Sequence, residues 1–189
     1  DSIVKSLSLG IGDRAIMCSG FFQEETPPGY MASAEPGFAS ALAHNPIKLT
    51  TIGVHNYGWR DRYRAFRDNM TAAGATVDAY YKKGMNWHAK IFLLERRGRC
   101  ILGIVGSSNV TRKAFGTSVP YNNECDVALW TRGAHRFGQW LDGALYESND
   151  DFPPVIRGSY STRANGGISI ADRLSVLREE VLSENLAPL

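Results

Sequence analysis

The order of the apolar segments constrains the fold of this chain more than any other feature. Apolar runs at 15–22, 47–54 and 75–81 have the length of buried strands, and they alternate with helix-like segments at 36–43 and 59–73. This alternation predicts parallel pairing, because two parallel strands need a long connection, which is usually a helix. The first half of the chain therefore predicts a parallel α/β sheet.

The middle of the chain changes to a different pattern. Apolar segments at 87–94 and 99–105 are separated only by Glu95-Arg96-Arg97-Gly98, which predicts an antiparallel hairpin with a tight polar turn. The other expected elements are a helix at 3–9, a loop at 23–37, a strand at 124–131, a helix at 134–146 and a helix at 170–182 capped by Ser169. Together they predict an α/β fold: a mixed central β-sheet flanked by helices on both faces. We expect one domain over residues 1–189, alone or as part of a longer chain.

Composition narrows the class of protein. The chain is 43% hydrophobic and 21% charged, which is ordinary for a globular domain, and no apolar run approaches the ~18 residues of a membrane span. The first ten residues lack the basic start and apolar block of a signal peptide. We expect Cys18, Cys100 and Cys125 to be reduced core thiols. The sequence contains no CxxC pair, so we do not expect a structural zinc site. These features predict a cytoplasmic protein without a membrane partner, a metal or another cofactor.

His88 and Lys90 are the clearest candidates for catalytic residues. Two residues apart on a strand, their side chains point to the same face. If the hairpin turns at Arg97-Gly98, His88 lies across from about Gly106-Ser107, and Asn109 lies just beyond the end of the second strand. The sequence therefore predicts that these groups converge at one edge of the sheet.

Basic residues gather around this motif. Between Lys82 and Lys113 there are eight basic residues and one acid, a net charge of +7, whereas the whole chain carries only +2 and the remainder therefore −5. The hairpin places Arg96, Arg97 and Arg99 about eight residues from the motif, roughly 25 Å at ~3.3 Å per residue. The residues expected near the motif are Lys82, Lys83, Arg112 and Lys113. Their positive potential favours a polyanionic substrate.

These residue types suit phosphodiester chemistry without a metal. A neutral imidazole such as that of His88 can attack phosphorus near pH 7, giving a phosphohistidine. Lys90 would neutralise phosphate oxygens, and Ser107 and Asn109 would donate hydrogen bonds as charge develops. Glu124 would orient the imidazole and stabilise its cation. A second histidine is needed to protonate the leaving oxygen.

The segments WHAKIFLLE, VGSSNVTRKAF and NNECDVALW resemble the phospholipase D superfamily, whose signature is HxK, four residues, Asp, and then a Gly-Ser-x-Asn segment. The spacing is most similar to the one-motif nucleases of that superfamily and to the catalytic domains of its metal-independent restriction endonucleases. Glu95 stands where the signature has Asp. The family needs two HxK motifs in one active site, and this chain has one. The resemblance therefore implies a homodimer in which two His88 residues face each other across a two-fold axis.

The sequence thus predicts a metal-independent DNA endonuclease, of restriction type, with a phosphohistidine intermediate. The alternatives are a phospholipid-cleaving or headgroup-transferring phospholipase D, and a non-catalytic nucleic-acid-binding module. We expect Ser108, Arg112 and Lys113 to bind substrate. Trp87 is expected in the core, and His44, His55 and His135 are expected at the surface or as capping residues. We expect the arginines of Arg60–Arg67 to form a solvated helix face rather than a phosphate site. Residues 150–167 are expected to form a connector in which Arg157 and Arg163 are exposed.

Overall fold

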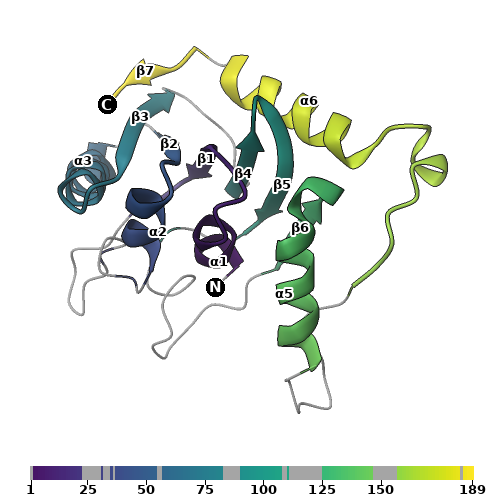
Figure 1. The fold of residues 1–189 in the computed structure, drawn as a ribbon. Coiled ribbons are helices and arrows are strands. Elements are labelled where there is room, and N and C mark those ends of the chain that lie inside the picture. Colours follow the sequence, from purple (N-terminus) through teal and green to yellow (C-terminus); the bar gives the residue numbers. More distant parts are fainter. Residues whose placement is uncertain are drawn as a thin grey trace.

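The computed structural model describes residues 2–22, 31, 35, 37–54, 57–82, 90–107, 110, 125–146, 157–183 and 185–189. Most of these residues belong to regular elements (Figure 1). The helices are α1 (Ser2–Ser8), α2 (Phe38–His44), α3 (Tyr57–Ala72), α5 (His135–Tyr146) and α6 (Ile170–Ser183), with 3-10 turns η2 (Arg132–Ala134) and η3 (Arg163–Asn165). The strands are β1 (Arg14–Ser19), β2 (Lys48–Val54), β3 (Thr76–Lys82), β4 (Lys90–Arg96), β5 (Arg99–Gly106), β6 (Asp126–Trp130) and β7 (Ala187–Pro188). Each described element that the apolar pattern predicts is present within a few residues of its expected bounds.

The strands form one sheet in the order β6-β5-β4-β1-β2-β3-β7. β1 pairs with β2, and β2 with β3, in parallel, whereas the remaining pairs are antiparallel. The parallel part is built by the two strand–helix–strand units of the first half. The expectation of a mixed sheet is confirmed.

The β4–β5 hairpin turns at the predicted place. Arg97 and Gly98 have positive φ values of 52° and 74°, as a two-residue type I′ turn requires. The Arg97 amide also donates to Asp13 Oδ2 at 2.7 Å, which fixes the turn against the start of β1. An irregularity between Leu94 and Glu95 shifts the register, so that Lys90 pairs with Gly106. The pairing of Lys90 differs by one residue from that in a regular hairpin, because a bulge adds an unpaired residue to one strand.

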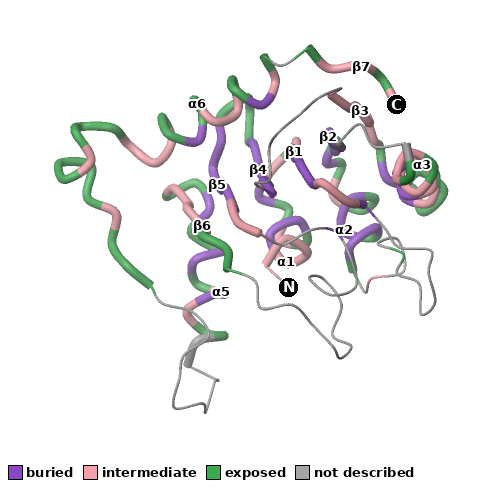
Figure 2. Tube along the Cα trace, turned by 180° about the vertical axis from the view of Figure 1, so that it is seen from behind, coloured by how far each residue is buried: buried purple, intermediate pink, exposed green. Residues whose placement is uncertain are grey.

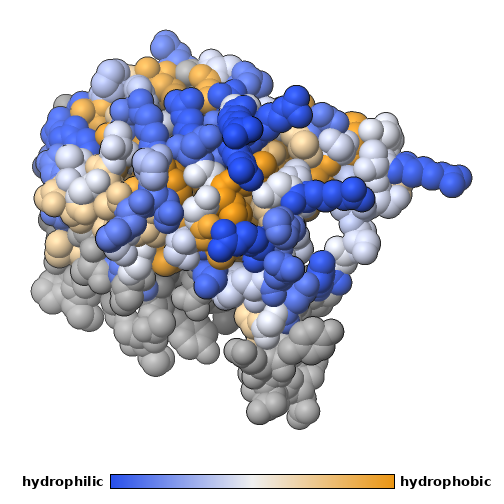
Figure 3. All heavy atoms as spheres, viewed as in Figure 1, coloured by the Kyte–Doolittle hydropathy of each residue, from blue (hydrophilic) through white to orange (hydrophobic). Residues whose placement is uncertain are grey.

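Helices cover both faces of the sheet. One face packs against α1, α2, α3 and α5 around a large apolar core that includes Phe38, Phe66 and Phe137. The other face packs against α6 through Leu174 and Val181. Figure 2 shows that the buried residues concentrate in the central strands, whereas α6 and the segment before it are largely exposed. In Figure 3, hydrophilic side chains cover most of the face drawn, and apolar atoms show only between them.

The ends of α3 and α6 follow from local sequence. At α6, the Asp172 amide donates to Ser169 Oγ at 3.1 Å and the Ser169 amide donates to Asp172 Oδ2 at 3.2 Å, a reciprocal cap that confirms Ser169 as N-cap. The hydrogen bonds from Ser169 lower the pKa of Asp172. α3 ends before Gly74, whose φ of 92° is the left-handed conformation that glycine adopts at helix ends.

The cysteines correct one expectation. Cys18 and Cys100 are buried thiols, and burial raises the pKa of each to about 12, with the Glu95 charge a further cause at Cys100. Cys125 is exposed, so it is not a core thiol. It lies just before β6, at the outer edge of the sheet, where no further strand covers it within the described residues.

Candidate active site

Lys90 and Ser107 are the two predicted site residues that the structure describes. His88, Ser108, Asn109, Arg112, Lys113 and Glu124 lie outside the described residues, as do Trp87, His55 and Lys83. The geometry around the motif is therefore defined by Lys90, by Ser107 and by the described residues that adjoin the motif segments.

Lys90 is the first residue of β4 and stands in a row of paired residues that crosses the sheet near the ends of the strands. It pairs with Gly106 on β5, and Gly106 pairs with Asp126 on β6. On the other side, Cys18 pairs with Ile91, so Ser19 is the next residue of β1 beside Lys90. Directly paired residues of neighbouring strands share a face, and this row lies on the face covered by α1, α2, α3 and α5.

Lys90 is only 7% exposed. A lysine is rarely this buried unless its ammonium has polar partners, because removal of the charge from water is costly. Lys90 has at least one interaction with the rest of the protein. A cation held here in a low-dielectric environment attracts an anion more strongly than a solvated lysine would.

Ser107 directly follows Gly106 at the end of β5. Its amide donates to the Cys125 carbonyl at 3.3 Å, and its hydroxyl accepts from the Cys125 amide at 3.2 Å. Cys125 directly follows Glu124 in the sequence. The end of β5 is thereby fixed against the chain segment that enters β6.

Ser19 anchors the segment that follows the Gly-Ser-Ser-Asn motif. The Val110 amide donates both to Ser19 Oγ and to the Phe21 carbonyl, each at 3.2 Å. Ser19 in turn donates to the Phe21 carbonyl at 2.6 Å, and Phe22 and Val110 form a parallel bridge. Val110, which follows the Gly-Ser-Ser-Asn motif in the sequence, therefore lies at the end of β1, next to the strand that carries Lys90.

Asp126 is a polar member of the row that the sequence analysis missed. A Cβ atom added to Gly106 would lie 1.8 Å from Asp126 Oδ1 and 2.6 Å from the Cys125 carbonyl oxygen. Glycine is therefore required at 106, since it lets the Asp126 carboxylate lie over β5. The signal in the sequence is the spacing, because positions 124 and 126 share a face in a strand.

Glu95, which occupies the Asp position of the family signature, lies at the opposite end of β4. It is 1% exposed and accepts a hydrogen bond from Arg178 Nε of α6, while the Cys100 thiol donates to it at 3.8 Å. This ion pair joins the helix to the sheet. Glu95 therefore has a structural role.

The structure also tests the other polar residues singled out from the sequence. Arg96, Arg97 and Arg99 lie at the turn end of the hairpin, away from Lys90, as predicted. His44 and His135 are exposed, and His44 Nδ1 lies 2.8 Å from the Ser40 carbonyl oxygen, a surface role.

The connector before α6 is also partly as expected. Arg157 and Arg163 are exposed, which confirms their prediction. In the described part of this segment, Arg157 forms an ion pair with Asp142 and lies over the Trp130 ring, and residues 150–156 lie outside the described residues.

The described residues hold no group of three or more His, Cys, Asp or Glu side chains arranged to bind a metal ion. In the same part of the chain, no helix is both long and apolar enough to span a membrane.

Comparison with known proteins gives structural similarities only. No protein-family model and no curated protein sequence matches the chain. Among solved structures, it is similar to Nuc from Salmonella typhimurium, described as a phospholipase D family member, with 14% identity, a TM-score of 0.44, and coverage of 75% of this chain and 80% of that one. Phosphatidylserine synthase from Haemophilus influenzae Rd KW20 gives 11% identity and a TM-score of 0.46, covering 99% of this chain and 44% of the other.

A third similar structure is polyphosphate kinase from Porphyromonas gingivalis, with 14% identity and a TM-score of 0.42, covering 82% of this chain and 25% of that protein. Identities of 11–14% and TM-scores below 0.5 support no conclusion about the function of this chain.

Proposed function

We propose that this protein is a metal-independent phosphodiesterase that cleaves DNA as an endonuclease of restriction type. The observation that carries the proposal is the buried residue Lys90, two residues after His88, in a row of paired residues with Gly106 and Asp126. A buried cation within a segment of the sequence that is rich in basic residues is suited to a phosphate group.

In the proposed reaction, His88 attacks the scissile phosphorus and forms an N–P bond while the P–O bond to the leaving group breaks. Lys90, Ser107 and Asn109 stabilise the negative charge on the phosphate oxygens. Glu124 holds the imidazole in the reactive tautomer. A second histidine donates its proton to the leaving oxygen and then accepts one from the water that hydrolyses the phosphohistidine.

The second histidine comes, in this proposal, from a second copy of the chain. One chain carries one His-x-Lys motif, so a two-fold axis through the site would bring two His88 residues together. Light scattering then gives about twice the 20.8 kDa chain mass. An active protein that is strictly monomeric would contradict the dimer.

DNA is the proposed substrate because of the charge distribution. The segment from Lys82 to Lys113 carries +7 in a chain of net charge +2. Ser108, Arg112 and Lys113, next to the motif in sequence, are proposed to contact the phosphates beside the scissile bond.

The test is incubation of the protein with duplex DNA, RNA and phosphatidylcholine vesicles in excess EDTA. We expect cleavage of DNA that is lost in His88→Ala and retained in the matched control His135→Ala, which removes an exposed histidine on α5. Cleavage that stops with EDTA would overturn the mechanism. Turnover of phosphatidylcholine alone would establish the phospholipase alternative, and DNA binding without turnover the non-catalytic one.

A further inference from the structure

We propose that five arginines at the turn end of the β4–β5 hairpin form a second DNA-binding surface, separate from the candidate active site. This turn-end surface consists of Arg96, Arg97, Arg99, Arg132 and Arg136. The proposed function gives these residues no role, because they lie away from Lys90. The inference rests on the proposed nuclease function for the identity of the polyanion, and it adds a second contact region.

Arg96 and Arg99 are directly paired across the hairpin turn. Directly paired residues share a face of the sheet, and their Cβ atoms lie about 4.5–5.5 Å apart. Like charges in this position destabilise a strand pair. The tight turn at Arg97-Gly98 and its hydrogen bond to Asp13 hold the strand ends in this arrangement. The fold therefore presents two positive charges side by side on a turn that is fixed at its base.

Two further arginines reach the same end of the sheet from the chain after β6. The Thr131 amide donates to the Ile101 carbonyl at 2.9 Å, which places the start of η2 beside the turn end of β5. Arg132 follows directly and is exposed. Arg136 of α5 donates from Nη1 to the Leu9 carbonyl at 3.0 Å. This acceptor is neutral, so the hydrogen bond leaves the charge of Arg136 uncompensated.

The turn-end surface carries an excess of positive charge. All five arginines are exposed. Within the described residues, the guanidinium groups of the three hairpin arginines and of Arg132 have no hydrogen bond or ion pair. The Asp13 carboxylate accepts from the backbone amide of Arg97. Five arginines and this one acid give the surface a net charge of +4.

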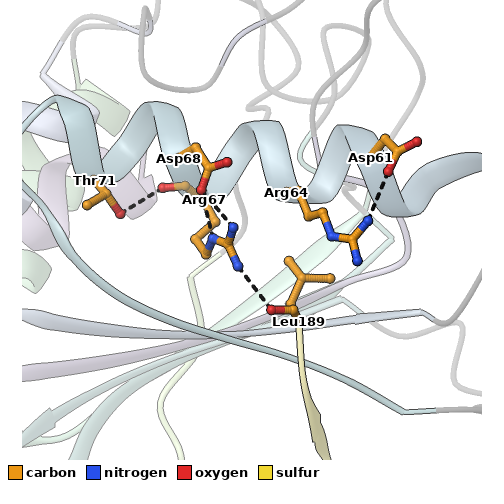
Figure 4. Close-up of polar contacts among 6 residues, drawn as sticks. All are labelled: Asp61, Arg64, Arg67, Asp68, Thr71 and Leu189. Atoms are coloured by element: carbon orange, nitrogen blue, oxygen red, sulfur yellow. Dashed lines mark hydrogen bonds and ion pairs between the residues drawn. The ribbon is translucent and has the colours of Figure 1, made fainter.

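Two arginines of α3 show the contrasting case of a structural role (Figure 4). Arg64 donates to Asp61 at 3.1 Å. Arg67 donates to Asp68 at 2.8 Å and to the Leu189 carbonyl at 3.0 Å. These contacts stabilise the surface of the helix and the end of the chain that follows β7. For these two residues no ligand is needed to explain the charge.

The other two arginines of α3 lie over aromatic rings. The Arg60 guanidinium is 4.8 Å from the centre of the Tyr81 ring, and that of Arg62 is 4.4 Å from the centre of the Trp59 ring. All four arginines of α3 are half-buried, so the helix face expected to be solvated is only partly solvated. The arginines of α3 thus have partners within the protein, whereas those of the turn-end surface are fully accessible to a ligand.

The side chains of the turn-end surface suit a phosphate backbone. A guanidinium stays charged and offers its N–H donors in a planar fork that fits phosphate oxygens. A protein interface or an insertion into a membrane also needs apolar side chains. The exposed large apolar residues in the described part of the chain are Met31, Val127, Ile168 and Val176, and none belongs to the hairpin turn, η2 or α5. The composition therefore favours DNA over a protein or a membrane.

The turn-end surface and Lys90 lie at opposite ends of the hairpin (Figure 1). β4 has seven residues, so at ~3.3 Å per residue the surface is about 20 Å from Lys90. Surfaces at opposite ends of a sheet face away from each other, so one straight duplex cannot contact both. The turn-end surface therefore holds a DNA segment other than the one in the active site. On long DNA this contact raises the concentration of further segments near the active site.

The test uses the double variant Arg96→Gln/Arg99→Gln, which removes the two paired charges. Its matched control is Arg64→Gln/Arg67→Gln, which removes two charges from α3. Both pairs are also introduced into Lys90→Met protein, so that the active site contributes less to DNA binding and cleaves the probe slowly. Binding of a fluorescent 20-base-pair duplex to the Lys90→Met proteins is measured by anisotropy over a series of salt concentrations.

We expect the turn-end variant to bind the duplex about tenfold more weakly than its parent protein. The slope of log K against log[salt] should fall by about 2, because two phosphate contacts are lost. The α3 control should change both quantities much less. The Tm of the turn-end variant should not fall, since the substitutions relieve repulsion between paired charges.

Three outcomes of these measurements would overturn the surface. The first is an equal effect of the turn-end variant and the α3 control on duplex binding. The second is a lower Tm of the turn-end variant with unchanged duplex binding, which would make its arginines structural. The third is a loss of binding to phosphatidylglycerol vesicles or to polyglutamate while duplex binding is kept.

Substrate size separates this surface from the active site. With Lys90 intact, the turn-end variant should hydrolyse bis(p-nitrophenyl) phosphate at the wild-type rate, because this small diester occupies only the active site. Its cleavage of dilute plasmid DNA in EDTA should fall by about the same factor as duplex binding. An equal loss with both substrates would contradict a surface that is separate from the active site.

The failures of the two proposals are distinguishable. Wild-type protein that binds the duplex through these arginines but does not cleave it in EDTA would overturn the proposed function alone. Cleavage in EDTA by a turn-end variant with unchanged duplex binding would overturn the turn-end surface alone.

Discussion

The two ends of the β4–β5 hairpin both contain a buried charged residue, yet the surroundings of the two residues differ. At the turn end, Glu95 is paired with Arg178 of α6, so its charge is neutralised within the protein. At the other end, Lys90 lies in a row at the edge of the sheet, between Ser19 and Gly106. The comparison teaches that burial of a charge does not by itself indicate a site. The place of the charged residue in the sheet and the chemistry of its neighbours indicate whether the charge stabilises the fold or belongs to a candidate site.

The largest expected effect is at the turn end. Arg178→Met leaves the Glu95 carboxylate buried without its ion-pair partner, which costs about 3–5 kcal/mol of the free energy of unfolding. At roughly 2–4 °C per kcal/mol for a chain of this size, Tm should fall by roughly 10 °C. Differential scanning calorimetry measures this change. The folded variant should keep its activity at low temperature, and a variant that melts normally but is inactive would reverse the assignment.

Lys90→Met should give the opposite result. The side chains have similar volume, but the variant lacks the cation that stabilises the phosphate oxygens. We expect kcat for DNA cleavage in EDTA to fall by about 10²–10³, the effect of losing one such electrostatic group. Tm should change less than in Arg178→Met. An unaltered kcat would remove Lys90 from the site.

Two glycines extend the comparison to the backbone. Gly106→Ala places a Cβ atom against the Asp126 carboxylate and the Cys125 carbonyl, so β6 must move and the polar row is distorted. Gly98→Ala meets no atom within 4 Å, but its φ of 74° costs a residue with a Cβ about 1–2 kcal/mol. We expect Gly106→Ala to lose cleavage activity, and Gly98→Ala to lose only stability, as measured by urea unfolding together with a cleavage assay.

The next comparison concerns the reactivity of the thiols. Cys125 near Ser107 is exposed, whereas Cys100 near Glu95 is buried and its pKa is raised to about 12. Titration of the native protein with a thiol reagent at pH 8 should modify one thiol per chain rapidly, since the thiolate is the reactive form. The other two should react only after unfolding. Rapid reaction of Cys100 would show that the turn end opens in the native state.

The same raised pKa values predict an alkaline limit of stability. Unfolded cysteine has its ordinary pKa of 9.0, and Cys18 and Cys100 are at about 12 in the fold. Between these values the unfolded chain loses thiol protons that the folded chain keeps, so the free energy of unfolding falls as pH rises above 9. Cys18→Ala/Cys100→Ala should show a flatter dependence between pH 9 and 12 in urea titrations. An unchanged slope would contradict the burial of these thiols.

The fold follows largely from local sequence. The parallel half is predictable because apolar strands and helices alternate, and the hairpin because Arg97-Gly98 permits a tight turn. Features that depend on residues distant in sequence could not be predicted. The ion pair between Glu95 and Arg178 joins residues 83 positions apart, and the exposure of Cys125 depends on the order of strands at the sheet edge.

The places of Lys90 and Ser107 in the sheet could be predicted from the sequence, but the polar neighbours of Lys90 could not. His-x-Lys spacing places Lys90 on a defined face, and the hairpin brings Ser107 to the same edge. Asp126 was missed because its relevance depends on the absence of a side chain at Gly106 across the strand pair. The contacts of Arg60 with the Tyr81 ring and of Arg62 with the Trp59 ring could not be predicted either, because helical periodicity does not reveal the aromatic rings beside them.

The hydrogen bonds of Val110 to Ser19 and Phe21 have a consequence for how the chain folds. Ser19 and Val110 are 91 positions apart, so this contact closes a long loop, whereas the β4–β5 hairpin forms from neighbouring residues. We therefore expect the hairpin to form early and the Val110 contact late. Folding intermediates would then contain an intact hairpin and no working site, and activity would return after most secondary structure during refolding.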